Sequence, residues 1–214
     1  MNVPMTMTDD AGRMLHFILT MEGGFVNDPK DPGGATRYGI SLRFLKIIDP
    51  ALADLDEDGD VDEDDIFSLT KDTAKDFYLR YFYRPMNIDQ YPAPLGAAML
   101  DTGVNMGRPA AGRILQQSLN RCGADLVVDG IVGNKTQAAL LFFDPMDTLR
   151  AVLLTRIFAY ADLCRKNPDL KRFFFGWVMR VQHLQEFCSD LERTAAYRTA
   201  SSDISSDVSS RETT

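Results

Sequence analysis

The apolar residues of this chain recur at helical spacing along most of its length, and this pattern constrains the fold more than any other feature. Leu15, Ile18 and Leu19 follow the i, i+3, i+4 spacing that places side chains on one helical face. A chain of 214 residues with 45% hydrophobic content can bury a sizeable core. We therefore expect an all-α, mainly helical fold, with further helices near residues 70–81, 95–106, 114–119, 147–165 and 177–197.

Glu22 continues the first apolar stripe, seven positions after Leu15. A carboxyl group in apolar surroundings tends to keep its proton near neutral pH, because burial disfavours the charged form. General acid catalysis requires such a protonated carboxyl. Gly23 and Gly24 should end the helix, since glycine adopts the left-handed conformation of a C-terminal cap without penalty. We expect Glu22 at a helix end, beside a loop.

That loop, residues 25–40, contains two prolines and three glycines. This composition opposes a regular helix and favours a structured turn, with a small hairpin as one form of it. Asp31 should be hydrated and ionised there. One carboxyl on an apolar helical face and one in a polar loop form the divergent pair that glycoside hydrolysis uses. The alternative is a helix-terminal glutamate and a turn-forming aspartate, because perturbed acids also occur in structural networks.

The segment resembles the signature of glycoside hydrolase family 108, in Glu-Gly-Gly-Phe-Val-Asn-Asp-Pro at residues 22–29, Asp-Pro-Gly-Gly-Ala-Thr at 31–36 and Tyr-Gly-Ile at 38–40. Members of that family are lysozyme-like N-acetylmuramidases, found among phage endolysins, autolysins and secretion activators. The resemblance implies that Glu22 is the catalytic acid. A looser similarity to lysozymes implies that Asp31 and Thr36 orient a water or stabilise positive charge at the anomeric carbon.

The resemblance also suggests residues that bind substrate. Phe25 stands where many members carry tyrosine, a change that keeps stacking on a sugar but removes a hydroxyl. Arg37 and Tyr38 in the same segment are further candidates for binding substrate, and Arg37 could attract the anionic peptide stems of peptidoglycan. Asp101 and Asn105 lie four apart on one face of the expected helix 95–106. In lysozyme-like folds such a helix lines the groove, although both side chains could instead serve capping and packing.

Residues 54–65 hold nine acids and no base, within a chain of net charge −8. Acids stand at loop positions 1, 3, 5, 9 and 12, Gly59 gives a turn at 6, and a carbonyl is available at 7. This order resembles an EF-hand or dockerin-type calcium loop, with aspartate at position 12 where glutamate is usual. A solvated acidic loop is the alternative. We expect a structural Ca²⁺, not required for chemistry, bound by Asp54, Asp56, Asp58, Asp60, Asp62 and Asp65.

A second unit can be made out from Pro109 onward. Val-Asp-Gly-Ile-Val-Gly-Asn-Lys-Thr at residues 128–136 resembles a motif of the peptidoglycan-binding domains that accompany family 108, and residues 175–181 agree with the same type. The aspartate and glycines could simply set turn geometry. We expect a catalytic region at 1–108 with the calcium-type loop inserted, a helical peptidoglycan-binding-like region at 109–197 packed on it, and a disordered tail at 198–214, where serine, threonine and acids dominate.

Several functional classes are disfavoured by composition. Three scattered cysteines do not indicate a disulfide framework, and the separate histidines His16 and His183 do not indicate a zinc site or a triad. The sequence has no glycine-rich phosphate-binding loop, and it has no basic stripe that would suggest nucleic-acid binding. No apolar run approaches the roughly 20 residues that span a bilayer, and a classical signal peptide is not recognised. We expect a monomer that is made in the cytoplasm and reaches the periplasm or cell wall by holin-type release, export or lysis.

The resemblances together imply an N-acetylmuramidase that cleaves the β-1,4 bond between N-acetylmuramic acid and N-acetylglucosamine, with Glu22 as general acid. One alternative is a non-catalytic peptidoglycan-binding protein that assists secretion or assembly. Another is a calcium-responsive regulator, which would expose an apolar groove when calcium binds.

Overall fold

The computed structural model describes residues 8–23 and 34–211, and over these residues it confirms a mainly α-helical fold. The chain forms two compact units, Met1–Pro85 and Met86–Thr214, and each is described by itself. The sequence-based boundary at residue 108 falls at the junction between two helices of the second unit. No helix in the described ranges has both the length and the apolar character needed to cross a membrane.

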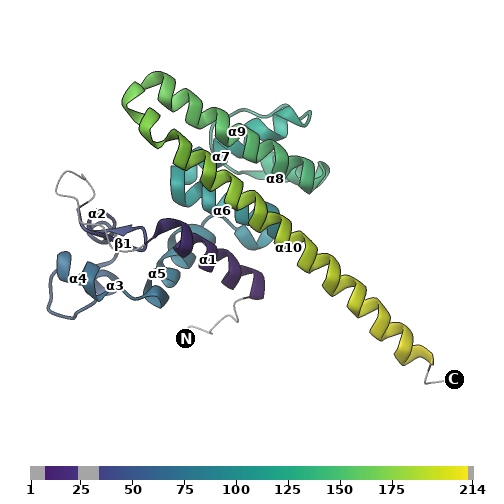
Figure 1. Cartoon of the computed structure of the whole chain (residues 1–214), viewed down its shortest axis with the longest axis horizontal. Helices are drawn as coiled ribbons and strands as arrows, with labels where there is room; N and C mark the ends of the chain where they lie inside the picture. The colour runs from purple at the N-terminus through teal and green to yellow at the C-terminus, as the bar shows by residue number, and fades with distance from the viewer. Residues whose placement is uncertain (1–7, 24–33, 212–214) are drawn as a thin grey trace. The chain divides into compact units, whose positions relative to one another are not determined.

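The first unit contains short helices around one small hairpin (Figure 1). Strand β1 pairs antiparallel with β2, with Thr36 opposite Ser41 and Arg37 opposite Ile40. A hairpin within the segment 25–40 is thereby confirmed. The elements in chain order are α1 (Asp9–Glu22), β1 (Thr36–Arg37), β2 (Ile40–Ser41), α2 (Leu42–Leu45), α3 (Pro50–Ala53), α4 (Glu63–Ser68), α5 (Lys71–Tyr78) and a π-helical turn (Leu79–Tyr83).

Helix α1 ends at Glu22 and buries its apolar stripe, as its sequence predicts, but Glu22 at the end of that stripe is only partly buried. The Thr8 side chain caps its N-terminus by accepting a hydrogen bond from the Ala11 N–H at 3.2 Å. Leu15, Ile18 and the rest of the apolar stripe are buried, and α1 packs against α5. The helix ends at Glu22 because Gly23 follows with φ of 75°, a value that favours glycine.

Helix α5 differs from its expected form at its C-terminal end. Thr70 caps its N-terminus by accepting a hydrogen bond from the Thr73 N–H at 3.1 Å. The spacing predicts one α-helix to Tyr81, but the last turn is π-helical. The aromatic ring of Tyr81 lies 5.3 Å from that of Phe44 in an edge-to-face contact. A wider turn of this kind often occurs near functional sites.

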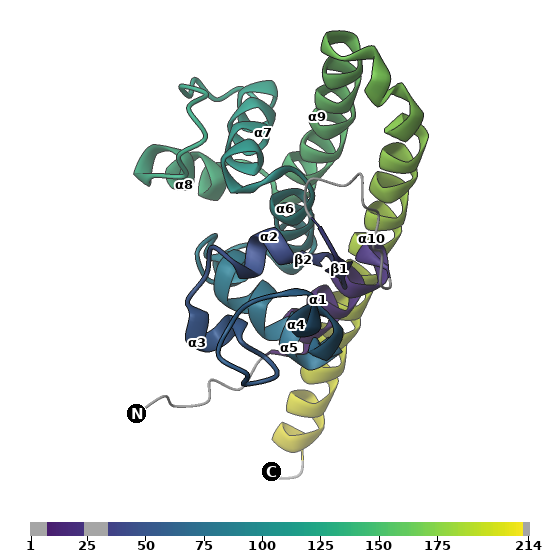
Figure 2. The same cartoon turned by 90° about the vertical axis from the view of Figure 1, so that its left-hand side faces the viewer.

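The second unit is a helical assembly around α6. Every residue of α6 from 94 to 103 is buried, and α7, α9 and α10 all pack against this helix. Helices α9 and α10 also pack on each other as a hairpin (Figure 2). The elements are a 3-10 turn (Ile88–Gln90), α6 (Ala93–Met106), α7 (Arg108–Arg121), α8 (Asn134–Phe142), α9 (Pro145–Lys166), a second 3-10 turn (Pro168–Leu170) and α10 (Lys171–Arg211).

Helix α10 is longer than the sequence predicts at both ends. Its expected range was 177–197, and it runs from Lys171 to Arg211, into the segment for which composition predicts disorder. The sequence holds no glycine or proline between Trp177 and Arg211. Since these two residues are the strongest helix breakers, nothing in the sequence stops the helix before Arg211.

Candidate functional site

Glu22 lies at the end of α1 with its side chain partly exposed. The turn between β1 and β2 covers one side of it. A Cβ atom added to Gly39 in this turn would lie 2.7 Å from both Cγ and Oε2 of Glu22. The backbone of the hairpin therefore approaches the carboxyl so closely that only glycine fits, while the partial exposure leaves the side chain accessible to a ligand.

Tyr78 from α5 completes this corner of the first unit. Its side chain is 1% exposed, and its hydroxyl donates a hydrogen bond to the carbonyl oxygen of Tyr38 at 2.8 Å. The same hydroxyl would overlap a Cβ atom at Gly39. Three elements, α1, the hairpin and α5, thus meet at Glu22. The sequence placed Tyr78 on an apolar helical face but did not indicate that its hydroxyl reaches the hairpin.

The hairpin carries three predicted site residues beside Glu22. The Thr36 hydroxyl donates to the Gly34 carbonyl at 3.2 Å. The Arg37 guanidinium donates to the Phe67 carbonyl on α4 and lies 5.3 Å above the ring of Tyr38. All three predicted residues are partly exposed. Arg37 therefore ties the hairpin to α4, a structural role that accompanies its predicted role in binding substrate.

Phe25 and Asp31 lie outside the described residues. Their predicted roles, stacking on a sugar and stabilising charge or orienting water, stay predictions.

Asp101 is completely buried in α6, in the second unit. Its carboxylate accepts hydrogen bonds from Nη1 of Arg156 at 2.6 Å and from Nη2 of Arg180 at 2.7 Å. Burial alone would raise the pKa of Asp101, but Arg156 and then Arg180 outweigh it and hold the pKa below its ordinary value. Asp101 has no exposed surface and two arginine partners. This geometry fits a role in packing better than a role in binding sugar.

Asn105 belongs to the same network. Its Oδ1 accepts a hydrogen bond from the Tyr160 hydroxyl at 2.5 Å, and that hydroxyl accepts one from Nε of Arg156 at 2.8 Å. The ring of Tyr160 stacks on Trp177, with centroids 5.0 Å apart. Trp177 and Arg180 come from the Gly-Trp segment of residues 175–181, so this segment supplies contacts that hold α6, α9 and α10 together.

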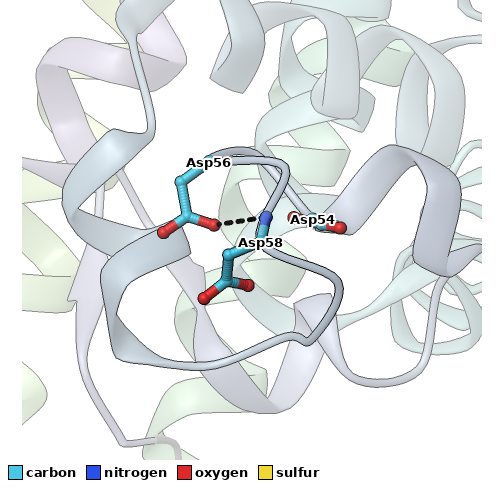
Figure 3. Close-up of side chains that lie close together, drawn as sticks. All are labelled: Asp54, Asp56 and Asp58. Carbon is cyan, nitrogen blue, oxygen red and sulfur yellow. Dashed lines mark hydrogen bonds between the residues drawn. The ribbon is translucent and has the colours of Figure 1, made fainter.

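The acidic loop brings three of its predicted ligands together. Carboxylate oxygens of Asp54, Asp56 and Asp58 all lie within 4.8 Å of one another (Figure 3). Oδ2 of Asp54 accepts a hydrogen bond from the Gly59 N–H at 3.1 Å, whereas its Oδ1 is buried without a hydrogen-bond partner among the described residues. A buried carboxylate oxygen without a donor, beside two more carboxylates, fits a bound cation.

Lost hydration and mutual repulsion both act on the acids of this loop. The pKa of Asp56 is raised by lost hydration and by the charge of Asp58. The pKa of Asp60 is raised first by the charge of Asp58 and then by lost hydration. A cation between these groups would offset the part of both shifts that comes from charge repulsion.

The last two predicted ligands close the loop through backbone contacts. Asp62 caps α4, accepting a hydrogen bond from the Asp64 N–H at 2.7 Å. Asp65 is 1% exposed, and its oxygens accept hydrogen bonds from the N–H groups of Leu55 at 2.5 Å and Asp62 at 2.8 Å. Asp65 thus connects the start of the loop to its end. This aspartate stands at loop position 12, where a longer glutamate is usual.

In the second unit, Gln116 on α7 forms hydrogen bonds that hold the glycine-rich turn after Val128 against this helix. The Gln116 amide donates to Oδ1 of Asp129 at 2.7 Å and accepts from the Gly130 N–H at 2.8 Å. Asp129 also accepts from the Ile131 N–H at 2.8 Å, and Gly130 has φ of 87°. The aspartate and glycine therefore set the turn geometry, as one reading of the sequence expected. Gln116 was not singled out by the sequence.

Comparison with known proteins agrees with both motifs. The family described as Glycosyl hydrolase 108 matches residues 15–107, and the family described as Predicted Peptidoglycan domain matches residues 110–182. The solved structure of Brucella abortus SagA is 27% identical to this chain and matches it with a TM-score of 0.66. The matched region covers 86% of this chain and 95% of the SagA chain. No curated protein matches the chain. The chain therefore carries a region that matches glycosyl hydrolase family 108, followed by a region that matches a peptidoglycan domain.

Proposed function

We propose that this protein is an N-acetylmuramidase that hydrolyses the β-1,4 bond between N-acetylmuramic acid and N-acetylglucosamine in peptidoglycan. The position of Glu22 carries the proposal. It lies within the family-108 match, at a helix end, partly exposed, with the turn of Tyr38 and Gly39 close to its side chain. The peptidoglycan domain that follows supports peptidoglycan as the binding partner.

In the proposed reaction the protonated Glu22 donates its proton to the glycosidic oxygen as that bond breaks. The sugar left behind develops positive charge at its anomeric carbon. Asp31 and Thr36 would stabilise that charge or orient the water that completes hydrolysis. This chemistry needs no metal. Because the substrate is the bacterial wall, the protein would act in the periplasm or cell wall, after holin-type release, export or lysis.

Replacement of Glu22 by glutamine tests the proposal. Glu22→Gln keeps the size of the side chain but removes the acid, so formation of new reducing ends from purified peptidoglycan should fall by about 10² to 10⁴-fold. Glu192→Gln makes the same chemical change at an exposed position of α10 and should keep full activity. Substantial hydrolysis by Glu22→Gln would refute the assignment.

The peptidoglycan domain also keeps a non-catalytic binding protein as a second candidate. Such a protein would sediment with peptidoglycan but release no reducing ends in its wild-type form. The two candidates therefore make opposite predictions for one assay on the unmodified protein.

We also propose that residues 54–65 bind one Ca²⁺ in a structural role. The convergence of Asp54, Asp56 and Asp58 and the unpartnered buried oxygen of Asp54 support it. Asp60 would add its carbonyl and Asp62 its carboxylate. Calorimetric titration should show a single site for Ca²⁺ that Asp58→Asn weakens. A calcium-responsive regulator would instead expose apolar surface on binding, which a dye such as ANS detects.

A further inference from the structure

We propose that Tyr78 is a positioning residue for Glu22, acting through the hairpin turn of Tyr38 and Gly39. The inference rests on the proposed role of Glu22 as general acid. It concerns a residue that touches neither the expected sugar nor its glycosidic oxygen.

The turn that covers Glu22 has a backbone conformation that needs support. Tyr38 has φ of 51° and Gly39 has φ of 75°, the combination found in two-residue hairpin turns with both central residues left-handed. Glycine adopts this conformation readily, but a bulky aromatic residue rarely does. A residue held in such a region persists only where its surroundings fix it, and residues of this kind cluster at functional sites.

Tyr78 supplies one of the contacts that fix the turn. Its hydroxyl donates to the Tyr38 carbonyl at 2.8 Å, and since Tyr78 is 1% exposed, water competes little for that bond. The ring of Phe82 packs at 5.8 Å from the ring of Tyr78 and limits its movement. The hydrogen bond therefore joins a rigid position on α5 to the strained residue of the turn.

Movement of the turn would be felt directly by the carboxyl. The Gly39 backbone leaves no room for a Cβ between itself, the Tyr78 hydroxyl and Cγ and Oε2 of Glu22. A catalytic group must be held within about 0.5 Å of its productive position, and a misplacement of about 1 Å can cost 10²-fold in rate. Loss of the Tyr78 hydroxyl should loosen the turn and with it the orientation of Glu22.

Tyr78→Phe removes the hydroxyl and keeps the ring. With soluble, uncrosslinked peptidoglycan strands as substrate, kcat should fall by about tenfold while KM changes by less than about twofold. The limb of the pH–kcat profile that reports the general acid should also shift, which a purely structural residue would not cause. Tyr81→Phe is the matched control, because its ring packs on Phe44 one turn further on, and it should behave as wild type.

A second variant tests the same contact by changing Gly39 in the turn instead of Tyr78. Gly39→Ala places a Cβ against the Tyr78 hydroxyl and the Glu22 side chain, so it should also lower kcat more than KM. A folded Gly39→Ala protein with full kcat would overturn the inference, even if Tyr78→Phe proved too unstable to assay.

The remaining outcomes separate this inference from the proposed function. If Glu22→Gln is inactive but Tyr78→Phe keeps the wild-type kcat and pH profile, Tyr78 does not position Glu22 and the muramidase proposal stands. If Tyr81→Phe loses as much activity as Tyr78→Phe, a general effect of α5 replaces the specific one. Inactive wild-type protein, or fully active Glu22→Gln, would remove the proposed function itself.

Discussion

Glu22 and Asp101 are both helical acids and both predicted site residues, but the structure gives them different surroundings. Glu22 is partly exposed at the end of α1, close to the backbone turn at Gly39. Asp101 is completely buried within α6, between Arg156 and Arg180. An acid between two arginines is held ionised, so Asp101 has the surroundings of a structural group, whereas the role of Glu22 as general acid stays a proposal that rests on its position.

The acidic loop shows a third arrangement. Asp54, Asp56 and Asp58 lie close to one another, whereas Asp101 lies between two arginines. We propose that the missing positive charge is supplied by an ion from solution. Under these proposals the chain uses its acids in three ways, and removal of one acid from each site should give a different result.

The largest effect on stability is expected for Asp101→Asn. This change leaves Arg156 and Arg180 in the interior without their counter-charge, and breaking a buried pair of this kind costs about 3–5 kcal/mol. Urea unfolding followed by circular dichroism measures the loss. The control is Asp162→Asn, which removes an acid paired with Arg165 and Lys166 on the exposed side of α9 and should change little. Equal stability of the two variants would contradict the structural role of Asp101.

Calcium removal should have the next largest effect. A ligand at about 100 times its Kd stabilises the folded state by about 2.7 kcal/mol, so a chelator should lower the Tm of the wild-type protein. Asp58→Asn should reduce this difference, because it removes one of the three converging carboxylates. Asp169→Asn, at the start of the turn before α10, should keep it. A Tm that does not respond to calcium would remove the metal proposal and leave Glu22 and Asp101 as before.

A decrease in pH should then show the contribution of Asp101 to the free energy of unfolding. Its pKa in the folded protein is below its ordinary value. The stability it contributes is therefore present above the pKa of an unfolded aspartate, about 4, and is lost as pH falls through the lower folded value. The free energy of unfolding of the wild type should decline over that acidic range more steeply than that of Asp101→Asn. Parallel declines would contradict the assignment of this pH dependence to Asp101.

The smallest effect on stability is expected for Glu22→Gln. A partly exposed side chain at a helix end usually contributes within about 0.5 kcal/mol. The variant should unfold at nearly the same urea concentration as the wild type, although its activity is lost. A large loss of stability would mean that Glu22 serves the fold, as Asp101 does.

Local signals in the sequence predicted much of the helical framework. The glycines after Glu22 ended α1 where expected, and the apolar spacing and Pro168 placed α9 within a few residues of its bounds, Pro145–Lys166. The proline- and glycine-rich segment contained the expected hairpin. These features depend on neighbouring residues along the chain, which is why spacing and breaker residues reveal them.

Contacts between distant segments were not predictable in the same way. The arginines that pair with Asp101 lie 55 and 79 residues away, and the Tyr78 hydroxyl reaches a carbonyl 40 residues away. Helical periodicity shows which face a residue occupies but not which group another element brings to it. For this reason the sequence left two readings of Asp101 open, sugar binding and packing, and the arginines that surround it could not be foreseen.

The most direct test of the central claim is hydrolysis of purified peptidoglycan by the wild-type protein in water enriched in heavy oxygen, with products identified by mass spectrometry. Hydrolysis with Glu22 as general acid predicts fragments that end in N-acetylmuramic acid and carry one heavy oxygen at the new reducing end, and no such fragments from Glu22→Gln. Fragments that end in N-acetylglucosamine or in anhydromuramic acid without the label, or no fragments at all, would contradict the account.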